Sequence, residues 1–227
     1  MDAIRVIHFS DVLCVWAYVS QTRVDELKKT MGGKVAIDVR FCSVFGDARS
    51  KLEARWSDRG GFSGYGAHVR DVVDGFDHVT VHPDVWRKMQ PASSLACHLF
   101  LCAVRRLAAA GSLGGTSEDC FNRVCWNLRE AFFRDLKNIS SRKVQLEIAE
   151  ELALPIDALV DCLDDGVAHA ELAADYDLAR EYQVTVSPTL ILNEGRQRLN
   201  GNVSYRVIDA NVRELLLQKE EEQASYC

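Results

Sequence analysis

The sequence has little proline and glycine, no long apolar run and no excess of positive charge. Only 4 of its 227 residues are proline and 14 are glycine, which excludes collagen-like and low-complexity chains. The formal net charge is −6 and no basic patch stands out, so we expect no nucleic-acid partner. The most apolar stretch, residues 95–110, contains a histidine and two arginines and is too short to span a bilayer. We therefore expect no membrane partner.

The amino-terminal residues lack the pattern of a signal peptide. Residues 1–11 contain neither a basic start nor a continuous apolar core, which predicts a cytoplasmic protein. The composition is that of an ordinary globular chain, with 48% hydrophobic and 26% charged residues. The length suits one large domain, or one domain that carries an insertion.

None of the eight cysteines is spaced C-x-x-C, so the usual zinc pattern is missing and we predict no metal site. His78 and His82 lie four residues apart, but no carboxylate motif accompanies them. In a large chain without an export signal, most cysteines are expected to be buried apolar side chains. This interpretation applies to five residues in the middle of the chain: Cys97, Cys102, Cys120, Cys125 and Cys162.

The two ends of the chain have the patterns of an α/β protein. Residues 4–9 and 35–42 are predicted strands, and residues 15–29 between them are a predicted helix, which implies a parallel pair joined by a crossover. Near the other end, residues 188–192 and 197–199 form a predicted hairpin that precedes a helix over 203–218.

The middle of the chain is predicted to be almost entirely helical, from residue 91 to residue 182. The glycine-rich segment 111–115 (GSLGG) interrupts this region. Thr116 or Ser117 is expected to begin the helix that follows. The glycine-rich segment 59–66 (RGGFSGYG) has no preceding strand and no following Lys-Ser/Thr, so we interpret it as a flexible connection rather than a phosphate-binding loop.

Cys14 differs from the other cysteines because it ends the turn between a strand and a helix. The free N–H groups of the first helical turn favour a thiolate, which predicts a lowered thiol pKa and the highest reactivity in the chain. Far along the sequence, Pro188 begins an apolar strand, where a proline suits a turn and a cis peptide bond.

Three short segments resemble the DsbA-like oxidoreductases of the FrnE type. Residues 11–18 (DVLCVWAY) resemble the active-site segment D-P-x-C-P-W-C-Y, and residues 93–98 (SSLACH) are similar to N-T-x-x-A-H. Residues 184–190 (VTVSPTL) resemble the cis-proline loop G-V-x-G-V-P-T-F. The 2-hydroxychromene-2-carboxylate isomerases and kappa-class glutathione transferases are related, with serine in the active-site turn.

The resemblance implies an α/β thioredoxin fold: a mixed central sheet flanked by helices, with an all-helical insertion subdomain. Residues 1–60 and 183–227 would form the core. Residues 61–182 would form the insertion, whose last helix returns to the core.

The resemblance also implies site residues. Cys14 would be the nucleophile, and the active-site turn would comprise Val15, Trp16 and Ala17. Ala17 stands where the family has its resolving cysteine, so the intramolecular release of a mixed disulfide is missing at the usual place. Val12 and Val15 replace the two prolines of the segment, and Ser93 replaces the asparagine of the insertion.

Further candidates would bind the substrate or a thiol. The backbone of Val186 or Ser187, next to Pro188, would pair with an extended thiol substrate. His98 is either a core histidine or a pocket residue. Gly201 and Asn202, before the last helix, would hold a carboxylate of glutathione, although Asn202 could equally be a plain helix cap.

Two enzymatic functions and one binding function remain open. The favoured function is a monothiol thiol–disulfide oxidoreductase, in which Cys14 attacks a small-molecule or protein disulfide and glutathione, Cys42 or Cys227 resolves it. The alternative is a glutathione-dependent isomerase or transferase that acts on a small aromatic or electrophilic substrate. The second alternative is a non-catalytic binding module. We expect no permanently bound cofactor, glutathione as co-substrate, and a chain compatible with a homodimer.

Overall fold

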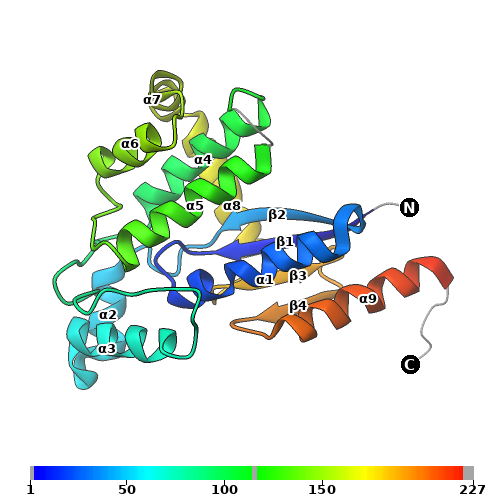
Figure 1. The fold of residues 1–227 in the computed structure, drawn as a ribbon, viewed down its shortest axis with the longest axis horizontal. Helices are drawn as coiled ribbons and strands as arrows, with labels where there is room; N and C mark the ends of the chain where they lie inside the picture. The colour runs from blue at the N-terminus through cyan, green and yellow to red at the C-terminus, as the bar shows by residue number, and fades with distance from the viewer. Residues whose placement is uncertain (1–2, 114–116, 222–227) are drawn as a thin grey trace.

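The computed structural model describes residues 3–113 and 117–221, and it is built around a four-stranded mixed sheet (Figure 1). The strand order is β2-β1-β3-β4. Strand β1 (Ile4–Ser10) pairs in parallel with β2 (Val35–Phe41) and antiparallel with β3 (Thr189–Leu192), which pairs antiparallel with β4 (Gln197–Asn200). This is the mixed sheet that the sequence predicted.

Helices cover both faces of the sheet because side chains alternate along its strands. Ile4 and Val6 of β1 pack with apolar residues of α1 (Val15–Met31) and α9 (Tyr205–Glu221). Ile7 and Phe9 of the same strand point to the opposite face, where they pack near α8 (Val167–Glu181). Figure 1 shows α1 and α9 in front of the sheet and α8 behind it.

Four helices form a group beside the sheet: α4 (Leu95–Ala109), α5 (Ser117–Phe133), α6 (Arg142–Glu151) and α7 (Ile156–Asp164). Helix α4 packs against α5, α7 and α8, so the predicted helical middle of the chain is correct. The predicted helix start at Thr116, and Gly114 and Gly115 before it, lie outside the described residues.

The segment predicted as a flexible glycine-rich connection is instead ordered helix, and the prediction was wrong. After α2 (Ala48–Trp56) the short 3-10 helix η2 (Ser57–Arg59) leads into α3 (Gly61–Val73). The glycines permit close packing: a Cβ on Gly64 would lie 1.7 Å from the Arg59 carbonyl oxygen, and one on Gly66 would lie 2.3 Å from that of Val85. At these two positions glycine allows close backbone contact and does not indicate a flexible segment.

The helical part is continuous with the thioredoxin-like core. One apolar cluster includes Val15 and Val19 of α1 together with Phe100 of α4 and Leu128 of α5. Helix α2 packs against α3, on either side of the predicted boundary at residue 61. Among the described residues, no helix is long and apolar enough to cross a membrane.

Candidate active site

Cys14 is the residue that immediately precedes α1, at the carboxyl end of β1. Its backbone is extended, with φ −83° and ψ 118°, and its N–H donates to the Asp11 carbonyl at 3.1 Å, which closes a tight turn. The Cys14 carbonyl accepts the N–H groups of Ala17 and Tyr18, so the helix begins directly after the cysteine. The side chain is 6% exposed.

The proline loop lies against this turn, although more than 170 residues separate them in the sequence. The Ser187–Pro188 peptide bond is cis. The Cys14 Sγ donates a hydrogen bond to the Ser187 carbonyl at 3.1 Å, and the Ser187 hydroxyl accepts the Asp11 N–H at 2.9 Å. The cysteine turn and the proline loop therefore meet, and the cis bond is the one expected at Pro188.

Asp11 organises the turn from beneath and has no exposed surface. Its carboxylate accepts the N–H of Leu13 at 3.0 Å, the N–H of Phe45 at 2.7 Å and the Ser94 hydroxyl at 2.9 Å. These donors come from the active-site turn, from the segment after β2 and from the start of α4. One buried carboxylate thus ties the cysteine turn to the strand layer and to the helical part, through neutral donors alone.

His98 of α4 lies beside Asp11 and is also without exposed surface. Its Nε2 accepts the Val12 N–H at 3.1 Å, so the ring proton is on Nδ1, which lies 3.0 Å from the Tyr176 hydroxyl oxygen and donates to it. Burial lowers the pKa of His98, consistent with a neutral ring. The ring stacks on Phe41 with centroids 4.6 Å apart. Its contacts hold the active-site turn in place.

The pKa of the Cys14 thiol is raised, so the predicted lowering was wrong. Burial has the largest effect, because it removes water from the thiolate. The N–H groups of Ala17 and Trp16 lower the pKa of Cys14, as the sequence predicted. The negative charge of Asp11 raises it and so adds to the effect of burial. The sequence located the helix start correctly, but it did not predict that the Cys14 thiol is buried.

A second thiol belongs to the same site. Cys42 directly follows β2, is 2% exposed, and its N–H donates to the Ser10 carbonyl at 3.1 Å. The Ser187 side chain lies near both thiols and lowers the pKa of Cys14 and of Cys42, and each cysteine is a free thiol. Burial, Asp11 and Cys14 raise the pKa of Cys42.

A cavity of about 690 Å³ opens beside this second thiol. Ser43 and Val44 line it on one side, and Val184 and Thr185, which precede the proline loop, line it on another. Three basic residues also line it: Lys51, Arg55 and Arg180. The cavity is therefore suited to a ligand with negative charge. A further cavity, of about 630 Å³ between α1 and α5, lies away from both thiols.

Comparisons with known proteins agree with this geometry. The family described as thioredoxin matches residues 116–209. The ClpXP adapter protein SpxH of Bacillus subtilis is 33% identical over 96 residues, which cover 40% of this chain and 32% of that protein. The match thus spans about a third of this curated relative.

Solved structures resemble the chain over nearly its whole length. The cytosolic disulfide reductase DsbM of Pseudomonas aeruginosa has a TM-score of 0.62 and 17% identity, with 96% of this chain and all of that chain covered. A 2-hydroxychromene-2-carboxylate isomerase has a TM-score of 0.65 and 13% identity, with 97% and 100% covered. The chain has a thioredoxin fold. The fold class inferred from three short segments is confirmed, and solved structures of DsbA-like oxidoreductases and of an isomerase share it.

The remaining predicted site residues take different positions. Val15 and Ala17 are buried in the first turn of α1, with Trp16 partly buried beside them. Val186 is 42% exposed next to the buried Ser187 and Pro188. Val186 is thus an exposed residue directly beside the buried proline loop.

Gly201 and Asn202 already have partners within the chain. The Gly201 N–H donates to the Pro188 carbonyl at 2.8 Å. Arg23 donates to the Asn202 Oδ1 and, at 2.6 Å, to the carbonyl of Val203. Ser204, rather than Asn202, immediately precedes the first residue of α9. These two groups connect the proline loop and α1 to the start of the last helix.

The sequence analysis missed Asp11, Ser94, Lys51 and Tyr65 as residues of the site. Asp11 was visible as the first residue of the active-site segment, and Ser94 as a residue of the second segment. Lys51 donates to the Val44 carbonyl at 3.0 Å and feels the charges of Cys14 and Asp11. Tyr65, on α3, is buried, and the nearby charges of Cys14 and Asp11 help to raise its pKa. No local sequence motif identifies Lys51 or Tyr65 as a site residue.

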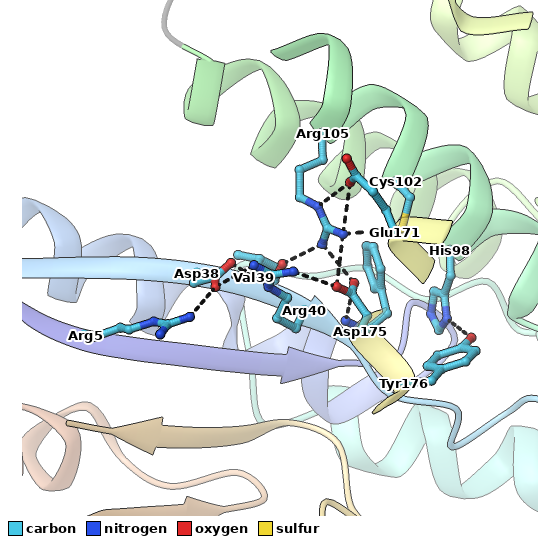
Figure 2. Close-up of polar contacts among 11 residues, drawn as sticks. Arg5, Asp38, Val39, Arg40, His98, Cys102, Arg105, Glu171, Asp175 and Tyr176 are labelled. Atoms are coloured by element: carbon cyan, nitrogen blue, oxygen red, sulfur yellow. Dashed lines mark hydrogen bonds and ion pairs between the residues drawn. The ribbon is translucent and has the colours of Figure 1, made fainter. Parts of the chain in front are cut away.

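A second buried carboxylate, Asp175 of α8, joins the helical part to the sheet (Figure 2). It accepts hydrogen bonds from Arg40 of β2 at 3.0 Å and from Arg105 of α4 at 2.9 Å, and it also accepts the Phe41 N–H at 3.1 Å. Arg105 further donates to the Val39 carbonyl at 3.0 Å. Residues 3–113 and 117–221 contain no cluster of acidic, histidine or cysteine side chains that could hold a metal ion.

Proposed function

We propose that this DsbA-like protein is a thiol–disulfide oxidoreductase with Cys14 as its nucleophile and a single cysteine in the C-V-W-A turn. The observation that carries the proposal is the 3.1 Å contact between the Cys14 Sγ and the Ser187 carbonyl. It joins the only cysteine of the turn to a loop with an exposed neighbour, Val186, whose backbone would pair with a substrate strand.

In the proposed reaction, the Cys14 sulfur attacks one sulfur of a substrate disulfide. A bond forms between these two sulfurs, the substrate's own S–S bond breaks, and its second sulfur leaves as a thiolate that takes up the proton lost by Cys14. The N–H groups of Ala17 and Trp16 stabilise the negative charge on the Cys14 sulfur. Burial and Asp11 oppose this charge, so the rate should rise with pH well above neutrality.

The cavity beside the site supports a substrate or co-substrate that carries carboxylates. Lys51, Arg55 and Arg180 give its wall an excess of positive charge. Glutathione combines two carboxylates with a thiol and is the co-substrate that we propose. The Pseudomonas aeruginosa disulfide reductase DsbM has been solved with this tripeptide, in a structure whose TM-score with this chain is 0.60.

A glutathione-dependent isomerase or transferase is the second candidate. It is favoured by the likeness to a 2-hydroxychromene-2-carboxylate isomerase and by Ala17, which leaves one thiol in the turn. In that case Cys14 and its surroundings would position glutathione against a small aromatic or electrophilic substrate. The relation to a ClpXP adapter protein supports the third candidate, a binding module without catalysis.

One set of assays separates the three. Reduction of 2-hydroxyethyl disulfide and of insulin by glutathione should be catalysed by the unaltered protein and lost in Cys14→Ser. Cys162→Ser is a matched control, because Cys162 is equally exposed, at 6%, but lies on α7. Turnover of an aromatic electrophile without disulfide reduction would replace the proposal with the isomerase or transferase. Absence of any turnover would support the binding module.

A further inference from the structure

We infer that Cys42 is the resolving thiol of this protein, replacing in space the partner that Ala17 lacks in sequence. The inference rests on the proposed function and names the group that completes its reaction. It comes from three features of the structure: the position of Cys42 at the end of the sheet, its proximity to Cys14 and Ser187, and the cavity beside it.

The sheet brings the two cysteines to the same edge. Strands β1 and β2 are parallel, and Ser10 pairs with Phe41 at their carboxyl ends. Cys42 therefore lies beside Asp11, because neighbouring strands are about 4.8 Å apart. The hydrogen bond from the Cys14 N–H to the Asp11 carbonyl closes a turn, which folds Cys14 back toward the strand ends.

Ser187 lies near both thiols. Its carbonyl accepts the Cys14 S–H at 3.1 Å, and its side chain is close enough to Cys14 and Cys42 to lower the pKa of each. The two cysteines are also close enough for the charge of one to raise the pKa of the other. Both are free thiols.

The other cysteines that the structure describes are less suited to this role. Cys97, Cys102 and Cys125 lie on helices α4 and α5, and neither Cys14 nor Ser187 is among the groups that shift their pKa values. Cys42 instead packs on the α8 face of the sheet and immediately precedes Ser43 and Val44, which line the basic cavity. A thiol displaced from Cys14 would therefore have a route out beside Cys42.

The step balances as a second thiol–disulfide exchange. After Cys14 has formed a mixed disulfide, the Cys42 sulfur attacks the Cys14 sulfur, an intramolecular Cys14–Cys42 bond forms and the substrate sulfur leaves as a thiolate. The leaving thiolate takes the Cys42 proton. The substrate disulfide gains two electrons from the two cysteines, and two molecules of glutathione return the protein to its reduced form.

The direct experiment is to oxidise the full-length protein with one equivalent of oxidised glutathione, block free thiols with iodoacetamide and digest it with trypsin without reduction. The expected product joins peptide 6–23, which contains Cys14, to peptide 41–49, which contains Cys42. The kinetic experiment follows the glutathionyl adduct on Cys14 by mass spectrometry. In Cys42→Ala its lifetime should rise roughly tenfold or more, because an intramolecular thiol acts at high effective concentration. Cys162→Ala should match the unaltered protein.

The outcomes separate the inference from the proposed function. An adduct on Cys14 that persists equally in the unaltered protein and in Cys42→Ala, with no linked peptide, overturns the role of Cys42 and leaves Cys14 as nucleophile. Failure of Cys14 to form any adduct overturns both. The linked peptide is measured in the unaltered chain, so the result does not depend on Cys42→Ala folding normally.

Discussion

Asp11 and Asp175 are both carboxylates without exposed surface, and both join the sheet to the helical part. Their partners differ. Two arginines, Arg40 and Arg105, surround Asp175, whereas Asp11 accepts only from backbone N–H groups and the Ser94 hydroxyl. The charge of Asp175 is compensated by direct contact with cations, and that of Asp11 is not.

The two carboxylates act on different thiols. Asp11 helps to raise the pKa values of Cys14, Cys42 and Tyr65, and its hydrogen-bond donors are all neutral. Asp175 instead helps to raise the pKa of Cys102 on α4. One buried carboxylate therefore stabilises the fold as part of an ion network, while the other also sets the electrostatic potential at the reactive sulfur.

The largest effect on stability is expected for Asp175→Asn. The change leaves Arg40 and Arg105 without their shared carboxylate, and breaking a buried ion pair costs about 3–5 kcal/mol. Urea unfolding should show a decrease of this order, with the titration of Cys14 unchanged. Asp38→Asn is the control, because Asp38 is 26% exposed and its ion pair with Arg40 should contribute less than about 1 kcal/mol. Equal losses would contradict the comparison.

Asp11→Asn should cost less stability but should alter the thiol. An amide nitrogen cannot accept the bonds from Phe45 and Ser94, which predicts a loss of about 1–3 kcal/mol. The negative charge of Asp11 disfavours the Cys14 thiolate, so removing it should lower the pKa of Cys14. The rate of iodoacetamide labelling against pH, followed on the peptide that contains Cys14, measures this shift. A pKa that stays the same or rises would show that Asp11 acts on the turn only through its hydrogen bonds.

The smallest effect on stability is expected for Ser94→Ala, about 1 kcal/mol, because Asp11 keeps its two N–H donors. The thiol should respond in the opposite direction to Asp11→Asn. Losing the hydroxyl leaves the Asp11 charge less shielded, so the pKa of Cys14 should rise further. Ser93→Ala is the matched control, since the Ser93 hydroxyl contacts Leu95 and not Asp11. A shift of the same sign for Ser94→Ala and Asp11→Asn would contradict this account.

Much of the fold could be predicted because its signals are local. Alternation of β-branched residues marks β1 and β2, the hairpin turn separates β3 from β4, and helical periodicity marks the middle of the chain. Segment 59–66 was misassigned because glycine content says nothing of close packing, and the need for glycine at position 66 comes from Val85, nineteen residues away.

By itself, the sequence determined that Cys14 precedes a helix, that Ala17 removes the usual partner and that Pro188 begins a strand. Only the tertiary structure decided what surrounds the sulfur. The burial of the sulfur, the hydrogen bond from Phe45 that helps to hold Asp11 and the position of Cys42 near Ser187 depend on segments more than thirty residues from Cys14 or from each other. A thiol pKa depends on every charge and every excluded water molecule near it, and folding, rather than spacing along the chain, brings those groups together.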